Sequence, residues 1–238
     1  MSDEIKNTPA TINGFAGVPE VANRFVDDFG TFTSALFLPR LSLEGSNSTN
    51  VKLKKIACGH YALITGRDQF EDLGDKIDIL VLTYRSKALD LTDKKNIISS
   101  YDKNSPVFKG IFEKAQVKTQ DKKGYMYGLE FLIYIPGAKN EQKFATFFCG
   151  NPTFRVAAKN FAPIVKSKKK TATLKVETIN NGTYIWEGPV ILACHTPLSH
   201  YPSMEDMETQ METFLNPIEG EVAEAATENE AAATTRER

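Results

Sequence analysis

The chain contains little cysteine, and none of it is spaced for a disulfide framework. The 238 residues include three cysteines, Cys58, Cys149 and Cys194, which are widely separated and form no Cys-x-x-Cys pair. Because structural disulfides persist mainly in oxidising compartments, this usage favours a reducing one. The segments CGH (58–60) and CH (194–195) match no common zinc-ligand spacing, so we expect no metal site.

Long hydrophobic runs are also missing. The apolar stretch LEFLIYI (129–135) is far shorter than the ~20 residues that a membrane-spanning helix needs. The first ten residues, MSDEIKNTPA, are polar and acidic, unlike a secretion signal, which is basic and then apolar. We therefore expect no membrane partner and a cytoplasmic location, which is the host cytoplasm if the chain is viral.

No signature of catalysis or of nucleotide binding occurs. Neither GxxxxGK[ST] nor a GxGxxG that follows a strand is present. A cysteine–histidine nucleophile would require 58–60 and 194–195 to meet beside a third, orienting group. Asp75, Asp78 and Glu130 could form a nuclease site, but carboxylates at strand margins usually serve solvation. We expect no catalytic residue, no cofactor and no enzymatic activity.

The net charge of −1 hides a segregation of charge along the chain. Residues 1–50 hold 3 Lys and Arg against 6 Asp and Glu, a charge of −3. Residues 51–198 hold 24 against 14, a charge of +10, and residues 199–238 hold 2 against 10, a charge of −8. A basic body attracts polyanions, and an acidic tail can compete for the same surface.

Composition predicts three parts. Residues 1–35 read as a flexible N-terminal arm with one short helix, residues 36–198 as a β-rich basic core domain, and residues 199–238 as an acidic tail. Within the tail, Ser203 can cap a short amphipathic helix over 203–215. Beyond Pro217 the sequence has almost no large apolar residues, so we expect disorder there.

The sequence pattern of residues 36–198, which we call the body, predicts a mainly β (β-rich α+β) fold. Runs such as VKLKKIA (51–57), HYALITG (60–66) and KIDILVLTYR (76–85) have strand character, and KIDILVLTYR is apolar on both faces. SPVFKGIFEKAQ (105–116) predicts a helix capped by Ser105. Sequential hairpins favour antiparallel pairing, so we expect roughly nine strands in an OB-like antiparallel barrel with two or three short helices, or a β-sandwich.

Basic and aromatic residues near strand ends are the candidates for binding a polyanion. Lysine clusters can follow phosphates, arginines can fork onto phosphates or stack on bases, and exposed rings can stack bases. A solvated loop is the alternative for each cluster, and the protein core is the alternative for each ring, including Phe144, Phe147 and Phe148. The predicted nucleic-acid-binding residues are Lys52, Lys54, Lys55, Arg85, Lys87, Tyr125, Tyr127, Lys143, Phe154, Arg155, Lys166, Lys168, Lys169, Lys170 and Trp186.

The helix predicted in the acidic tail carries the candidates for binding a partner protein. Its apolar residues fall on one helical face, and most of its other residues are acidic. The predicted partner-binding residues are Met204, Met207, Met211, Phe214 and Leu215.

Three segments resemble parts of bacteriophage-encoded proteins whose roles are mostly unassigned. These are FLPRLSL (37–43), the block from QFEDLG to ILVLTYRSKALDL (69–91) and KFATFFCGNPTFR (143–155), within a similarity that covers about residues 36–198. The design is also similar to phage and bacterial single-stranded DNA-binding proteins of the OB fold, in architecture only. The chain departs from those proteins by ending in Arg-Glu-Arg, with its apolar tip at 207–215.

These observations lead to one expected function and one alternative. The expected function is non-catalytic binding of single-stranded DNA in viral replication or recombination, with replication proteins as further partners of the acidic tail. The alternative is a structural or assembly protein of a virion with a β-sandwich body. The sequence does not distinguish DNA from RNA and does not predict the oligomeric state.

Overall fold

The computed structural model describes the part of the chain between residues 38 and 216, with gaps. The described residues are 38–66, 69–93, 97–117, 124–150, 158, 161, 164–166, 170–180, 182 and 185–216. The chain divides into two compact units, Met1–Phe37 and Leu38–Arg238, and every described residue belongs to the second. The N-terminal arm and helix expected within 1–35, and the disorder expected beyond Pro217, therefore lie outside the described residues.

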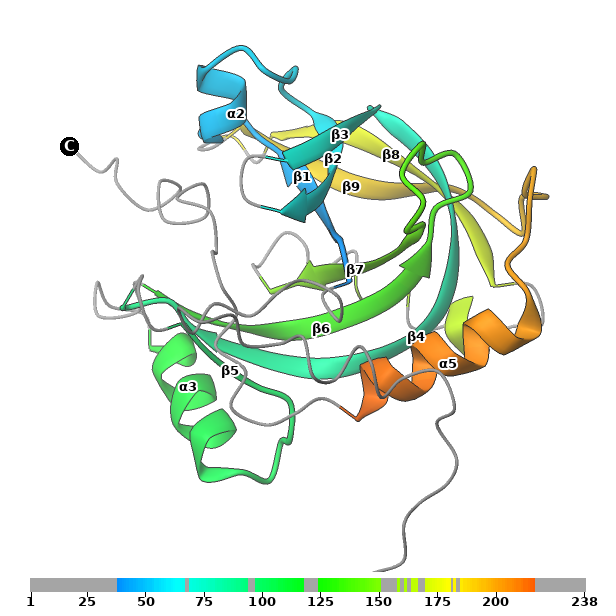
Figure 1. The fold of residues 1–238 in the computed structure, drawn as a ribbon. Helices are drawn as coiled ribbons and strands as arrows, with labels where there is room; N and C mark the ends of the chain where they lie inside the picture. The colour runs from blue at the N-terminus through cyan, green and yellow to red at the C-terminus, as the bar shows by residue number, and fades with distance from the viewer. Residues whose placement is uncertain are drawn as a thin grey trace, which may run out of the picture. The chain divides into compact units, whose positions relative to one another are not determined.

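Nine strands and three helices have defined bounds (Figure 1). The strands are β1 (Arg40–Glu44), β2 (His60–Gly66), β3 (Gln69–Gly74), β4 (Lys76–Asp90), β5 (Ile98–Ser100), β6 (Tyr125–Tyr134), β7 (Phe144–Cys149), β8 (Thr171–Asn180) and β9 (Ile185–Cys194). The helices are α2 (Thr49–Lys52), α3 (Pro106–Gln116) and α5 (Met204–Leu215).

All nine strands belong to one sheet. Its order is β3-β2-β1-β7-β6-β4-β8-β9, and β5 pairs with β4. The prediction of a mainly β fold is confirmed. The OB-like antiparallel barrel is not confirmed: among the described strands β1 pairs with β7 in parallel, and the sheet ends at β3 and β9 without closing into a barrel. Hairpin patterns could not show the parallel pair, since Arg40 meets Thr146 from a distant part of the chain.

The long strand β4 organises the sheet. Its residues 76–80 pair with β8 and its residues 80–90 with β6. Ile77, Ile79 and Val81 lie in the main core, whereas Leu80 and Leu82 lie in a second apolar cluster. This arrangement explains why the segment is apolar at both alternating sets of positions. We call the two sides of the sheet the core face and the α5 face.

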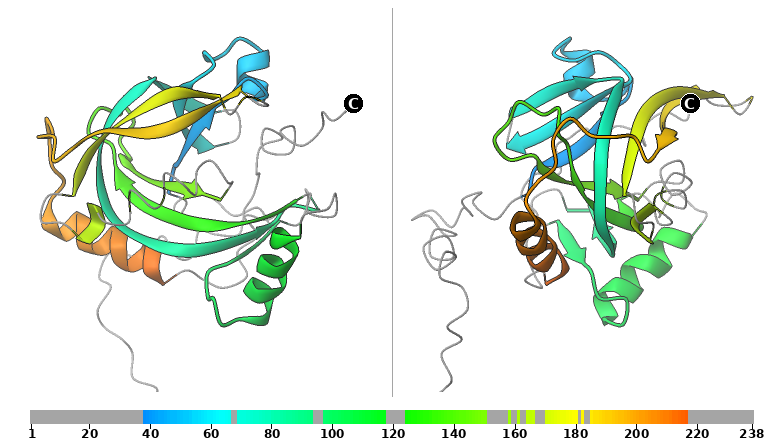
Figure 2. Two further views of the ribbon diagram at one scale, coloured as in Figure 1. Left: turned by 180° about the vertical axis from the view of Figure 1, so that it is seen from behind. Right: turned by 90° about the vertical axis from the view of Figure 1, so that its right-hand side faces the viewer.

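The helix α5 covers the second cluster. Met207, Met211 and Phe214 of α5 pack against Leu80 and Leu82 of β4, in a cluster that also includes Leu132, Tyr134 and Phe144. The helix α3 packs at another part of the sheet, where Phe108 and Ile111 contact Ala88 of β4. Figure 2 shows both helices against the sheet from two further directions.

Helix boundaries follow the capping residues that the sequence predicts. Ser105 accepts a hydrogen bond from the Phe108 N–H at 3.1 Å at the start of α3. Ser203 accepts one from the Asp206 N–H at 3.0 Å at the start of α5. Both helices therefore begin one residue after the predicted cap, because the cap's side-chain oxygen accepts a hydrogen bond from a backbone N–H of the first turn.

The strand expected over VKLKKIA (51–57) is wrong. The helix α2 ends at Lys52 and a turn follows, in which Lys54 has a positive φ of 57°. The apolar alternation that favoured a strand does not face a core here, because Leu53 is 59% exposed. The hydroxyl of Ser48 bonds instead to the buried carboxylate of Glu44, which holds the start of α2 against β1.

Candidate functional site

Two predicted cations meet a buried carboxylate on the α5 face. In the β4–β6 pair, Arg85 stands directly opposite Glu130, and Lys87 lies two residues further along β4 on the same face. Opposite charges at facing positions of neighbouring strands attract each other. The register of the two strands therefore builds an ion-pair network that neither segment shows alone.

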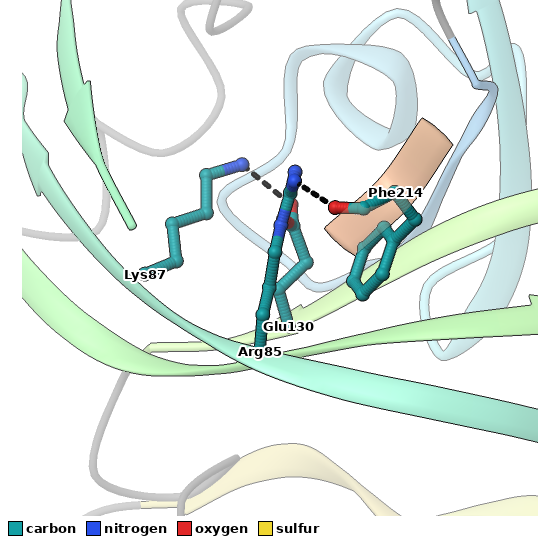
Figure 3. A network of polar contacts seen from close by, with 4 residues as sticks. All are labelled: Arg85, Lys87, Glu130 and Phe214. Carbon is teal, nitrogen blue, oxygen red and sulfur yellow. Dashed lines mark hydrogen bonds and ion pairs between the residues drawn. The ribbon is translucent and has the colours of Figure 1, made fainter. Parts of the chain in front are cut away.

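The network is closely spaced and mostly buried (Figure 3). Arg85 Nε donates to Glu130 Oε2 at 2.8 Å, and its Nη2 lies 2.8 Å from the same oxygen. Lys87 Nζ donates to Glu130 Oε1 at 2.5 Å. The side chains of Arg85, Lys87 and Glu130 are 15%, 14% and 2% exposed. Two cations share one carboxylate, so the three side chains together carry one uncompensated positive charge.

The charged forms of Lys87 and Glu130 stabilise each other. Burial alone lowers the pKa of Lys87, but attraction to the Glu130 carboxylate and the hydrogen bond to it outweigh burial and raise that pKa. Burial alone raises the pKa of Glu130, but Lys87 and Arg85 outweigh it and hold the pKa of Glu130 below its usual range. Both groups therefore stay ionised around neutral pH.

Aromatic rings surround the two cations. The Arg85 guanidinium carbon lies 3.7 Å from the centroid of Tyr101 and 4.2 Å from that of Phe214. Lys87 Nζ lies 5.7 Å from the Tyr101 centroid and 5.3 Å from that of Phe148. These distances are in the range of cation–π attraction. We call Arg85, Lys87, Glu130, Tyr101, Phe148 and Phe214 the cationic cluster.

The cationic cluster connects the body to the acidic tail. Arg85 Nη1 donates a hydrogen bond to the backbone carbonyl oxygen of Phe214, near the end of α5. The ring of Phe214 is 2% exposed and packs in the α5-face apolar cluster. The acidic side chains Glu205, Glu208 and Glu212 of α5 remain exposed to solvent. The one described helix of the acidic tail is thus docked on the body.

The predicted partner-binding residues divide into two groups. Met207 and Met211 are half-buried and, with Phe214, pack against the body. Met204 and Leu215 are 66% and 49% exposed. Most of the apolar face of this helix therefore packs on the sheet of the same chain, and partner binding by these residues stays a prediction.

The other predicted cations lie in separate places. Lys52, Lys54 and Lys55 are exposed on α2 and the turn after it, at a distance from the α5 side of the sheet (Figures 1 and 2). Lys143 donates to the Pro136 carbonyl at 3.3 Å in the loop between β6 and β7. Lys170 donates to the Leu82 carbonyl at 3.4 Å, and Lys166 is exposed.

The predicted stacking rings have mixed surroundings. Tyr127 packs edge-on against Phe112 of α3, with ring centroids 4.6 Å apart. Lys114 Nζ lies 4.9 Å from the Tyr125 centroid. Trp186 of β9 is half-buried, and its buried indole N–H has no hydrogen-bond acceptor among the described residues. The candidates Phe154, Arg155, Lys168 and Lys169 lie outside the described residues.

Sequence reasoning missed three members of the cationic cluster. For Phe148 the sequence left open whether the ring belongs to the core, and the structure buries Phe144 and Phe147 but leaves Phe148 half-buried on the α5 face. The available signal was the alternation of side chains along β7, which places Phe144 and Phe148 on one face and Phe147 on the other. Tyr101 and Glu130 had no comparable signal, since their placement depends on how β5 and β6 pair with β4.

Other kinds of site find no support in the described part of the chain. Within it, no group of three or more His, Cys, Asp and Glu side chains is placed to hold a metal ion. Asp78 accepts a hydrogen bond from Thr173 at 2.6 Å, whereas Glu130 belongs to the cationic cluster. Two of the three carboxylates considered for a nuclease site therefore have different partners. Cys58, Cys149 and Cys194 are free thiols. None of the described helices combines the length and apolar composition of a membrane span.

The cationic cluster is thus the place where the predicted residues of the body and of the acidic tail meet. Comparison of the chain with protein-family models, with curated proteins and with solved structures found no match.

Proposed function

We propose that this protein binds single-stranded DNA without catalysing a reaction and serves viral DNA replication or recombination. One observation carries the proposal: the acidic tail is docked, through Phe214, on a cluster that holds an uncompensated positive charge. A nucleotide offers the same two kinds of group that Phe214 offers, a flat ring and an oxygen acceptor. Single-strand binders combine a basic surface with rings on which bases stack.

The distribution of charge supports the same function. The segment 51–198 has a charge of +10 and the acidic tail a charge of −8. Exposed lysines on and after α2 offer a further basic surface, remote from the cationic cluster. A long single strand could contact both surfaces, because phosphate contacts depend on charge and not on sequence.

In this proposal the body is an open relative of the OB architecture. The OB fold is a five-stranded, partly open barrel that binds oligonucleotides on one face and its adjoining loops. The mixed, unclosed sheet of this chain departs from the standard barrel, so the cationic cluster on the α5 face takes the place of a conventional barrel groove.

Fluorescence anisotropy of a labelled 20-nucleotide oligo-dT tests the proposal. The full chain is expected to bind at low salt, and a hairpin duplex of equal phosphate count serves as the control. Preference for the single strand supports the function. No binding of either probe at low salt rejects it.

A virion structural or assembly protein is the second candidate. Among the described strands, β3 and β9 end the sheet and each has one open edge, and β9 exposes Ile185 and Leu192 to 68% and 52%. Open edges with exposed apolar residues favour strand pairing between molecules. Sedimentation that shows large, stable assemblies of a chain without DNA affinity would favour this function over the first.

A further inference from the structure

The surroundings of Lys87 carry a more specific inference, which rests on the proposed function. We infer that Tyr101 and Phe148 form a base-stacking subsite around Lys87, which receives one nucleotide of a single DNA strand. The two rings would hold the base, and the Lys87 ammonium would bind the adjoining phosphate.

The two cations of the cluster differ in how many hydrogen-bond donors remain available to a ligand. Arg85 directs Nε and Nη2 to Glu130 and Nη1 to the Phe214 carbonyl. Lys87 makes its one hydrogen bond within the described residues to Glu130. Since an ammonium group has three donors, Lys87 retains donors for a phosphate oxygen. The uncompensated positive charge of the network is thus best placed at Lys87.

Both rings lie within cation–π distance of this ammonium group. Lys87 Nζ lies 5.7 Å from the Tyr101 centroid and 5.3 Å from the Phe148 centroid. Both rings are half-buried, so part of each reaches solvent. The ring of Tyr101 covers the Arg85 guanidinium at 3.7 Å, which fixes the ring in place before any ligand arrives.

The backbone after β7 packs closely against the second ring. A Cβ atom added at Gly150 would lie 2.2 Å from the Phe148 ring, so only glycine allows this close approach. A ring held in this way loses little conformational freedom on binding, which favours stacking. Two rings from separate segments, both ordered by neighbours, thus border one ammonium group that has donors to spare.

The test separates stacking from phosphate binding by comparing two probes. One is a labelled 20-nucleotide oligo-dT, and the other is a strand of equal length made of abasic units, which has the same phosphates and no bases. Anisotropy is measured at low salt for the full chain and for Tyr101→Leu, Phe148→Leu and Lys87→Gln. Tyr201→Leu is the matched control, because Tyr201 is 52% exposed and lies outside the cluster.

We expect the wild-type chain to bind oligo-dT more tightly than the abasic strand. Each ring variant should weaken oligo-dT binding about 5- to 150-fold and leave abasic binding unchanged. Lys87→Gln should weaken binding of both probes, and Tyr201→Leu should weaken neither. Ring variants that lose affinity for both probes equally, or for neither, overturn the subsite and leave the proposed function standing. A wild-type chain that binds neither probe rejects the proposed function itself.

A second measurement on the wild-type chain does not depend on the folding of any variant. An oligo-dT that carries one 5-iodo-deoxyuridine is crosslinked by ultraviolet light, and the attached peptides are identified by mass spectrometry. Crosslinks at Tyr101 or Phe148 support the subsite. Crosslinks confined to other residues overturn it.

Discussion

The guanidinium of Arg85 donates a hydrogen bond to the backbone carbonyl of Phe214, across 129 positions of sequence. The same guanidinium lies 4.2 Å from the centroid of the Phe214 ring. A residue of the basic body and a residue of the acidic tail therefore meet at one point. The predictions below test what this contact and its neighbours contribute.

Replacement of Glu130 by glutamine is expected to destabilise the fold by about 3 kcal/mol, because it leaves two buried cations without their carboxylate. The free energy of unfolding is measured by urea titration. The matched control is the triple variant Arg85→Met, Lys87→Met and Glu130→Leu, which removes every charge and is expected to be much closer to wild type. An unchanged stability of Glu130→Gln would show that the network has no structural role.

The same network predicts how stability depends on pH. The pKa of Glu130 is lowered in the folded chain, so its contribution is complete above about pH 4.3, the ordinary pKa of a glutamate, and disappears as the pH falls toward the lowered value. The pKa of Lys87 is raised, so its contribution is complete below about pH 10.4 and disappears as the pH rises through the raised value. Urea midpoints at a series of pH values check both, and Glu130→Gln should flatten the acid branch.

The secondary structure was predictable where local chemistry decides it. Ser105 and Ser203 marked the starts of α3 and α5, and the apolar residues of both faces in KIDILVLTYR marked the central strand β4. The sheet order was not predictable, because β1 pairs with β7 from a remote part of the chain. The strand predicted over 51–57 was wrong because alternation of apolar residues indicates a strand only where one face meets a core, and that also depends on distant parts of the chain.

Phe214→Ala is expected to release the end of α5 from Arg85 and to tighten binding of oligo-dT. Loss of a buried phenylalanine costs about 3 kcal/mol of packing, and here that packing holds the acidic helix on the cationic cluster. Anisotropy measures the affinity, and hydrogen exchange of the α5 amides measures the release.

Leu215→Ala is the control for this prediction, because Leu215 is the next residue of the same helix and is 49% exposed. It should change neither the affinity nor the exchange rates. Equal affinities of Phe214→Ala and the wild-type chain, with faster exchange in α5, would show that the acidic tail does not compete with DNA.

Ser203→Ala is expected to weaken α5 by about 1 kcal/mol, the usual cost of losing an N-cap hydroxyl. Ser203 accepts from the Asp206 N–H and donates to the Asp206 carboxylate at 2.6 Å. Faster hydrogen exchange confined to α5 would confirm the prediction. Threonine at this position should preserve the cap and leave exchange near wild type.

The candidate site was predictable only in its separate parts. Arg85, Lys87 and Phe214 each stood out by type and position, but their meeting depends on the docking of α5 on the sheet, which no local pattern encodes. Glu130 and Tyr101 complete the cluster through strand pairing. The exposed lysines on and after α2 lie elsewhere, so the predicted nucleic-acid-binding cations do not form one continuous surface among the described residues.

The salt dependence of oligo-dT binding by the full chain tests the central claim most directly. Each phosphate that the protein neutralises should add about −0.7 to the slope of log affinity against log salt concentration. The account predicts measurable binding at low salt and a slope that corresponds to several neutralised phosphates. Lys87→Gln is expected to make the slope shallower by the contribution of about one phosphate. No binding at low salt, or binding with a flat salt dependence, would contradict it.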